Sequence, residues 1–128
     1  VDIRSLHLGH MALEKGVLPR MQDLDVEEAW VLMMNQNFKL IKAEPLSHGG
    51  ITETAVDVRL IIKKALLNNA TIIALCHNHP SNNPTPSKQD DQLTLNVKKA
   101  CDVMRLFFMD HIIVTDGHYY SYHDKGRL

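Results

Sequence analysis

The stretch ATIIALCHNHPSNNPTPSKQD, residues 70–90, decides the fold class of this chain. Its first seven residues, 70–76, are all apolar or β-branched, which is typical of a strand buried on both faces. Residues 80–86 hold three prolines and two asparagines, which remove backbone donors and favour turns, so they predict a loop. A helical pattern starts at Ser87. A buried strand that leads through a loop into a helix indicates an α/β unit.

The sequence on both sides of this stretch extends the same pattern, with apolar residues at strand or helix spacing and turn residues between them. The predicted strands are 29–34, 38–43, 70–76, 107–115 and 118–123, and the predicted helices are 57–68 and 87–104. The first two strands are expected to form a β-hairpin, and Asp116-Gly117 predicts a turn between the last two. We therefore predict an α/β fold in which one mixed β-sheet is flanked by helices, in the order β-β-α-β-α-β-β.

The length and composition indicate one domain. A chain of 128 residues with 45% hydrophobic and 23% charged residues has the make-up of a single globular unit with one modest core. Residues 25–128 are predicted to form that domain, and residues 1–24 a helical segment that packs on it. The chain begins at Val1 rather than at an initiator Met, which suggests a fragment of a longer protein.

The net charge and the hydropathy of the chain limit the kinds of partner that it is expected to bind. A formal net charge of −1 lacks the basic excess that drives binding to nucleic-acid backbones, so DNA is a minor candidate. No apolar run has the roughly 20 residues of a membrane span, and we expect a cytoplasmic protein without a membrane partner. Cys76 and Cys101 lack a metal-binding or redox spacing and are expected to be buried, reduced thiols.

The candidate chemistry lies where the central strand ends in His77-Asn78-His79. Side chains alternate along a strand, so the two imidazoles lie on the same side of the backbone. The proline-rich loop lets the chain turn back, and Asp90, in the first turn of the next helix, can reach the same point. Each residue alone has a simpler explanation, because strand-end histidines are common and Ser87 with Asp90 also reads as a helix cap. Together they predict a metal site.

The ligand set favours zinc with a catalytic role. Two imidazoles and one carboxylate leave the fourth tetrahedral position open, whereas a structural zinc site fills all four positions with protein ligands, mostly cysteine. Water at such an open position can reach a pKa of roughly 7.

These residues resemble a known signature. His77-Asn78-His79, with ten residues between His79 and Asp90 and with Ser87 three before Asp90, resembles the JAMM motif of JAB (MPN+) hydrolases. More narrowly, residues 77–90 and Asp110-His111-Ile112-Ile113-Val114 resemble the RadC-type JAB domains, which are often labelled DNA repair proteins. The resemblance implies a JAB/MPN-like, cytidine-deaminase-like sheet. It also implies zinc bound by the two histidines and Asp90, with Ser87 steadying the attacking water or the oxyanion.

The same resemblance implies an upstream glutamate as general base. Glu28 is the first choice, because it opens the first predicted strand much as the family's glutamate does. Glu44, which closes the next predicted strand, is the reserve, and Glu27 is the neighbour that faces the other way. A solvated acid at a strand end is the simpler reading of all three.

Two functions are therefore consistent with the sequence. The first is a zinc-dependent hydrolase that cleaves a peptide or isopeptide amide bond in a protein substrate. The second is a DNA-repair-associated or regulatory binding module whose metal site is structural or vestigial. The letters HNH also spell a nuclease motif, but such nucleases distribute their histidines over a ββα unit rather than one strand end. The substrate and the oligomeric state are left open.

Overall fold

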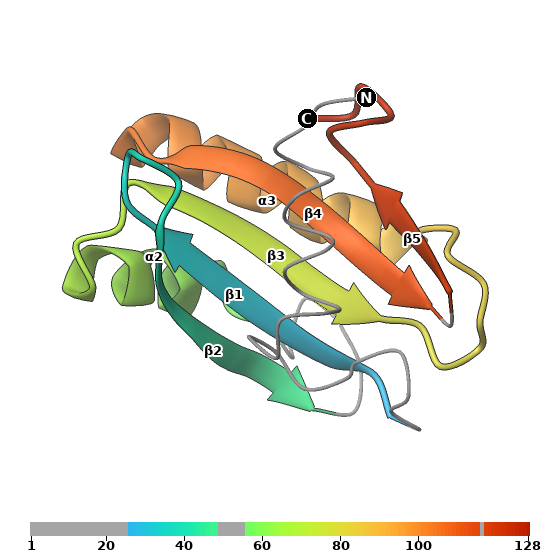
Figure 1. The fold of residues 1–128 in the computed structure, drawn as a ribbon. Helices are drawn as coiled ribbons and strands as arrows, with labels where there is room; N and C mark the ends of the chain where they lie inside the picture. Colours follow the sequence, from blue (N-terminus) through green and yellow to red (C-terminus); the bar gives the residue numbers. More distant parts are fainter. Residues whose placement is uncertain (1–25, 49–55, 116) are drawn as a thin grey trace.

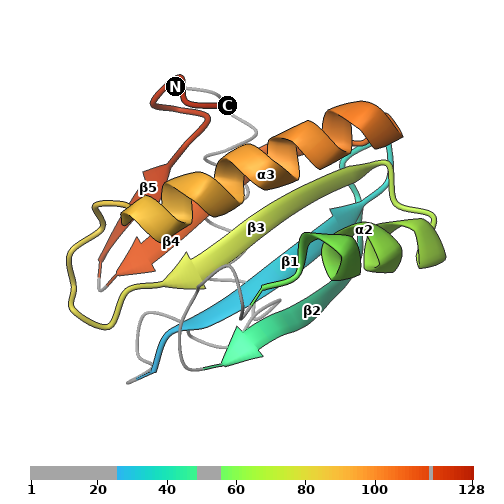
Figure 2. The same ribbon diagram turned by 180° about the vertical axis from the view of Figure 1, so that it is seen from behind.

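A five-stranded mixed sheet carries both described helices on one of its faces (Figures 1 and 2). The computed structural model describes residues 26–48, 56–115 and 117–128. The strands are β1 (Glu28–Met34), β2 (Leu40–His48), β3 (Ile72–Asn78), β4 (Phe107–Thr115) and β5 (His118–Ser121), and the helices are α2 (Val58–Leu67) and α3 (Lys88–Met104). The strand order is β2-β1-β3-β4-β5; β3 and β4 run parallel, and every other neighbouring pair is antiparallel.

The predicted α/β fold and the order of its elements are confirmed. Strand boundaries differ from the prediction by a few residues: the strand predicted at 70–76 spans Ile72–Asn78, the strand predicted at 118–123 ends at Ser121, and β2, predicted at 38–43, spans Leu40–His48. The strand tolerates Pro45 because β2 is an edge strand, where a missing backbone donor costs no sheet hydrogen bond on its outer side. The predicted N-terminal segment, 1–24, lies outside the described residues.

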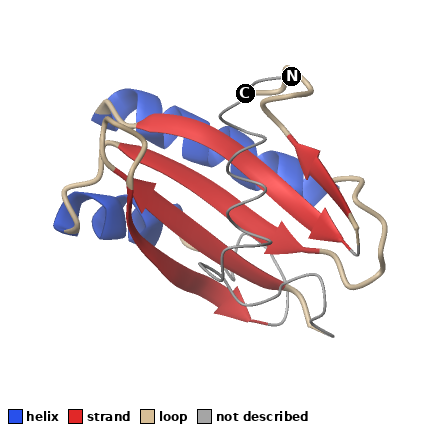
Figure 3. Ribbon diagram, in the orientation of Figure 1, coloured by secondary structure: helices blue, strands red, loops and turns tan. Residues whose placement is uncertain are grey.

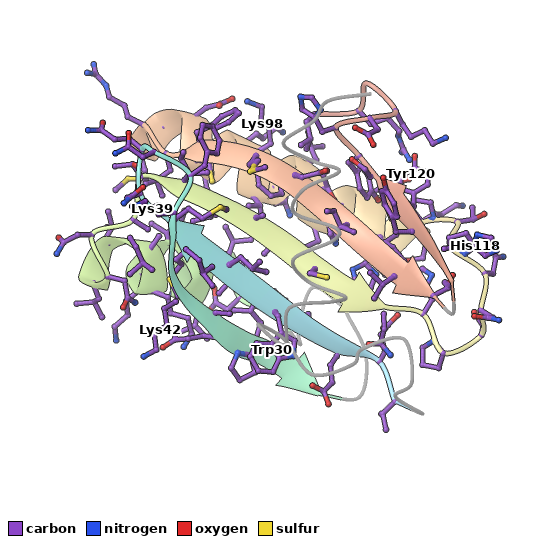
Figure 4. All side chains as sticks on the ribbon, viewed as in Figure 1. Trp30, Lys39, Lys42, Lys98, His118 and Tyr120 are labelled. Atoms are coloured by element: carbon purple, nitrogen blue, oxygen red, sulfur yellow. The ribbon has the colours of Figure 1, made fainter. Side chains whose placement is uncertain are left out.

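The sheet edges differ in character, and the central strands are the most buried. Lys42 projects from the β2 edge, whereas His118 and Tyr120 lie on β5 at the opposite edge (Figure 4). In β3 every residue is buried, as expected of a strand with neighbours on both sides and apolar layers on both faces. His77 and Asn78 therefore lie at the end of a strand that is buried along its whole length.

Each face of the sheet has its own apolar layer. The layer under the helices contains Val31, Ile73, Leu75, Ile61 from α2 and Val97 from α3, among others. The opposite layer contains alternate residues of the same strands, including Leu32, Ala74, Cys76 and Ile112. Figure 3 shows both described helices behind the sheet, on the side of the first layer.

Both cysteines are buried free thiols, and burial raises the pKa of Cys76 to about 12.

The layer under the helices should dominate stability. Ile73 is completely buried between sheet and helices, and Ile73→Ala should lower the free energy of unfolding by about 2–5 kcal/mol, because it removes apolar contacts and leaves a cavity. Val103, on α3, is 80% exposed, so Val103→Ala should change stability by no more than about 0.5 kcal/mol. Urea unfolding followed by circular dichroism measures both. Equal effects of the two variants would contradict the assignment of this layer as the core.

A one-residue bulge in β4 changes which side chains face the helices. Ile73 pairs with Phe108, but the next residue of β3, Ala74, pairs with Asp110, so Met109 is an extra residue. Directly paired residues share a face of the sheet. His111 therefore pairs with Leu75 and points to the helix side, whereas an uninterrupted alternation from Phe108 would have placed Asp110 there.

The bulge is held by the side chain beside it. Asp110 is fully buried, and its carboxylate accepts hydrogen bonds from the backbone N–H of His111, the backbone N–H of His123 and the hydroxyl of Ser121. A bulge leaves backbone donors without their ladder partner, so this carboxylate supplies the acceptor that the neighbouring strand does not.

Neither described helix has the length and apolar character that a membrane-spanning helix needs.

Candidate metal centre

Three side chains from the end of β3 and the start of α3 meet at one point. His77 Nε2 and His79 Nε2 are 3.0 Å apart. Asp90 Oδ1 lies 3.3 Å from His77 Nε2, and Asp90 Oδ2 lies 3.1 Å from His79 Nε2. The structure therefore brings together the three residues that the sequence nominated as ligands.

The local sequence explains why these side chains converge. His77 follows Ile73 and Leu75 at every second position of β3, so it points to the helix side of the sheet. On α3, Ser87 is the N-cap: its hydroxyl accepts from the Asp90 N–H at 3.0 Å, and its own N–H donates to Asp90 Oδ2 at 2.8 Å. This capping box fixes the carboxylate at the mouth of the helix, directed toward the two imidazoles.

A buried chain of hydrogen bonds sets which nitrogen of His77 carries its proton. The Thr94 hydroxyl donates to the backbone carbonyl of Asp90 at 2.8 Å, so at 2.6 Å its oxygen must accept from His111 Nδ1. Complete burial, and next the neighbouring His77, lower the pKa of His111 well below its ordinary value, so its ring is neutral. His111 Nε2 then accepts from His77 Nδ1 at 2.7 Å. With Nδ1 committed, His77 Nε2 faces the centre, and in the neutral ring it carries the lone pair that a metal would take.

The second imidazole is oriented in the same way by a backbone group. His79 Nδ1 lies 2.8 Å from the carbonyl oxygen of Asn83, in the loop before α3, and a carbonyl can only accept. His79 Nε2 is therefore the atom that faces Asp90. The hydrogen bond to Asp90 raises the pKa of His79, against the opposing effect of burial. Burial alone would raise the pKa of Asp90, but hydrogen bonds with His77 and His79 hold it well below the ordinary carboxyl value.

These groups fit a zinc ion. In tetrahedral zinc sites with bonds of about 2.0–2.2 Å, the ligand atoms lie about 3.3–3.5 Å from one another. At this centre the 3.0 Å distance between the two imidazole nitrogens and the 3.1 Å distance from His79 Nε2 to Asp90 Oδ2 are slightly shorter than that, and the 3.3 Å distance from His77 Nε2 to Asp90 Oδ1 lies within it. Two nitrogen lone pairs and a carboxylate so close together repel one another unless a cation or a proton lies between them. The donor set and the spacing both suit a divalent metal.

His111 is expected to govern metal affinity without binding the metal. Because His111 is the acceptor that orients His77, His111→Phe should weaken zinc binding by about 10–100-fold while keeping a flat ring in the same space. Competition with a fluorescent chelator at fixed pH measures the affinity. Tyr122→Phe is the matched control: Tyr122 stacks on His111 with ring centroids 5.0 Å apart, and this variant keeps the stack. An unchanged zinc affinity in His111→Phe would show that the hydrogen-bond chain has no such role.

Among the three candidate glutamates, Glu27 has its carboxylate at the centre. Glu27 Oε1 lies 3.5 Å from His79 Nε2, and Glu27, His77 and His79 place potential ligand atoms within 4.8 Å of one another. Asp90 lies closer, contacts both imidazoles and is more buried than Glu27, so it is the better third ligand. Glu27 stands on the side of the centre where His79 is partly open to solvent.

The two glutamates favoured by the sequence engage other groups. Glu28 Oε1 accepts a hydrogen bond from the Trp30 indole at 3.1 Å. Glu44 forms ion pairs of 2.8 Å with both Lys42 and Lys64, and hydrogen bonds from these lysines, Lys42 first, lower the pKa of Glu44. We therefore assign the carboxylate at the centre to Glu27 in place of Glu28.

The sheet register explains why the carboxylate at the centre comes from Glu27 rather than from Glu28. Ala29 pairs directly with His77, so these two residues share a face of the sheet. Glu27 lies two residues before Ala29 and comes to the same side, whereas Glu28 lies two residues before Trp30 and follows the opposite layer. Pairing of β1 with β3 was the missing signal, because both faces of β1 are apolar and its sequence alone does not say which face carries the histidines.

The fold and this centre define a domain of the JAB type. The chain belongs to the RadC-like JAB domain family, whose model matches residues 10–127. It is similar to UPF0758 proteins of Porphyromonas gingivalis, with 48% identity over 115 residues, and of Flavobacterium johnsoniae, with 45% over 108 residues; these alignments cover 89% and 84% of the chain and 51% and 47% of the relatives. A UPF0758 protein of Streptococcus sanguinis is 31% identical over 94% of the chain and 53% of its own length. The chain thus spans about half the length of these curated relatives.

Proposed function

We propose that this domain is a zinc-dependent hydrolase of the JAMM type that cleaves a peptide or isopeptide amide bond in a protein substrate. One observation carries the proposal: His77 Nε2, His79 Nε2 and the Asp90 carboxylate converge within 3.0–3.3 Å, and the other nitrogen of each imidazole is committed to an acceptor. Bound to these groups, zinc would supply Lewis-acid activation of water and of the scissile carbonyl.

Glu27 is the general base in this proposal. Its carboxylate takes a proton from the attacking water as the new carbon–oxygen bond forms, and it returns that proton to the amide nitrogen as the carbon–nitrogen bond breaks. Its side chain is 25% exposed beside His79, so it stands where a substrate can enter. The Ser87 hydroxyl, which accepts from the Asp90 N–H, keeps its own proton available to steady the water or the oxyanion.

A second function follows from the same cluster. If Glu27 binds the metal as a fourth protein ligand beside His77, His79 and Asp90, the site is closed, and a closed zinc site is structural. The domain would then be a binding or regulatory module, and a DNA-linked version would have to work without a basic excess, at a net charge of −1. Glu27 Oε1 lies 3.5 Å from His79 Nε2, farther than the 3.0–3.3 Å that separate the imidazole nitrogens and the Asp90 oxygens, which favours the open, catalytic arrangement.

The test combines metal analysis with a cleavage assay. The purified protein is expected to bind one zinc per chain and to cleave members of a panel of peptides and lysine-linked isopeptides. A chelator should abolish cleavage, and added zinc should restore it. A protein that neither contains nor takes up zinc would exclude the proposal. Stoichiometric zinc without cleavage, together with DNA binding that weakens as salt rises, would support the binding module instead.

A further inference from the structure

Asn78 lies between the two candidate histidine ligands and belongs to none of the chemistry described so far. It is the last residue of β3 and is buried, with 1% of its surface exposed. Burial of an amide side chain is costly unless its donor and acceptor are both satisfied. The contacts of the Asn78 amide therefore indicate its structural role.

The Asn78 side chain holds the backbone on both sides of Glu27. Its Oδ1 accepts from the N–H of Glu28 at 2.7 Å, and its Nδ2 donates to the carbonyl of Val26 at 3.0 Å. The paired register between β1 and β3 ends at Ala29 and His77, one residue short of this point. The amide thus continues the ladder with side-chain atoms and fastens residues 26–28 to the strand that carries the histidines.

Only a short amide meets this requirement. The contact needs an acceptor for an N–H and a donor for a carbonyl, in one plane and in a fixed order, and asparagine offers both within a single side chain. Aspartate at this position would offer only acceptors and would oppose the Val26 carbonyl. Alanine would leave both backbone groups without these partners.

We propose that Asn78 is a positioning residue that holds Glu27 over the open side of the metal centre. The proposal rests on the function proposed above. Glutamate loses much side-chain rotamer freedom when it is ordered, and a fixed backbone lowers the number of conformations that compete with the one facing His79. The Glu27 carboxylate reaches to 3.5 Å from His79 Nε2 from a backbone segment that Asn78 fastens on both sides.

The structural part of the test is independent of metal and substrate. Backbone amide exchange of Glu28 is measured by NMR in the wild type, Asn78→Ala and Asn78→Asp. Asn78→Ala should lose the protection of the Glu28 amide. Asn78→Asp keeps the shape and the acceptor and should retain protection, so it remains informative if the alanine variant folds poorly. Asn96→Ala is the matched control, because Asn96 lies on α3 and accepts from Gln92. Unchanged exchange in Asn78→Ala would overturn the proposal.

The functional part uses cobalt-loaded protein and acetohydroxamate as the probe, followed by visible absorption. A hydroxamate gives its proton to a carboxylate beside the metal, whereas azide, the second probe, has no proton to give. Glu27→Gln and Asn78→Ala should each weaken acetohydroxamate binding by about 10–100-fold, as expected for a lost hydrogen bond to a charged group. The double variant should be no weaker than Glu27→Gln alone, because Asn78 acts through Glu27. Azide affinity should stay unchanged in all three.

The outcomes separate this inference from the function on which it rests. Wild-type protein that binds no cobalt would exclude both. Cobalt binding with normal acetohydroxamate affinity in Asn78→Ala would overturn only the role of Asn78. Additive losses in the double variant would also overturn it, because they would mean that Asn78 acts on the metal centre by a route that does not pass through Glu27.

Discussion

Glu27→Gln is expected to lower amide hydrolysis by about 10²–10⁴-fold while the protein still binds one zinc per chain. The substitution keeps the size of the side chain and removes the group that accepts the proton of the attacking water. Zinc should stay bound because Asp90 and the two imidazoles lie within 3.0–3.3 Å of one another, whereas the Glu27 carboxylate lies farther away, 3.5 Å from His79 Nε2. The comparison uses steady-state cleavage of the best panel substrate beside zinc content.

The neighbouring glutamates test the assignment. Glu28→Gln should keep most of the wild-type rate, because the Glu28 carboxylate accepts from the Trp30 indole. Glu44→Gln should do the same, because Glu44 pairs with Lys42 and Lys64. A large loss in Glu28→Gln with little change in Glu27→Gln would restore the assignment that the sequence favoured. Loss of zinc in Glu27→Gln would instead identify Glu27 as a ligand and the site as a closed one.

Asp90→Ala is expected to raise the dissociation constant for zinc by more than about 100-fold, because losing even the partner of a ligand costs about 10–100-fold. The substitution removes the only carboxylate in contact with both imidazoles in the described part of the chain. It also removes half of the capping box of α3, so Asp90→Asn, which keeps the shape of the side chain, should be measured beside it. Chelator competition gives the affinity, and thermal unfolding reports the loss of the cap.

Asp91→Ala is the matched control for this experiment. Asp91 lies in the same first turn of α3, but its carboxylate accepts from the Tyr122 hydroxyl at 2.6 Å and pairs with Arg127 at 2.9 Å. Its loss should affect the C-terminal packing and leave zinc affinity unchanged. If both substitutions weakened zinc equally, the effect would come from the helix terminus rather than from a ligand.

The sequence was sufficient for the fold and for the convergence of three side chains, for a physical reason. Strand alternation and the helix cap are local rules, and the proline-rich loop after His79 lets the chain turn back so that Asp90 can reach the two histidines. Pairing between distant segments is not local. The side of the sheet on which Glu27 lies depends on such pairing, through the register of Ala29 with His77. The extension of β2 to His48 likewise depends on its partner strand and not on its own residues.

The position of His111 likewise could not be predicted from local sequence. His111 lies in an apolar strand, and the alternation of that strand does not distinguish an outer partner of the centre from an ordinary core histidine. The structure places it between His77 and Thr94. A bulge in a parallel pair of strands made that possible, and nothing in the local sequence marks where the extra residue falls.

The bulge makes β4 respond differently to the loss and to the gain of one residue. Deleting Met109 would remove the extra residue, so Asp110 would follow Phe108 directly, still opposite Ala74, and His111 would still pair with Leu75 and face the helices. Substitution of Met109 by another apolar residue would leave the spacing, and with it the aim of His111, intact. An added residue between Phe108 and His111, in contrast, would need a second irregularity or would turn His111 to the far side of the sheet, so an insertion here should be more harmful than the loss of Met109.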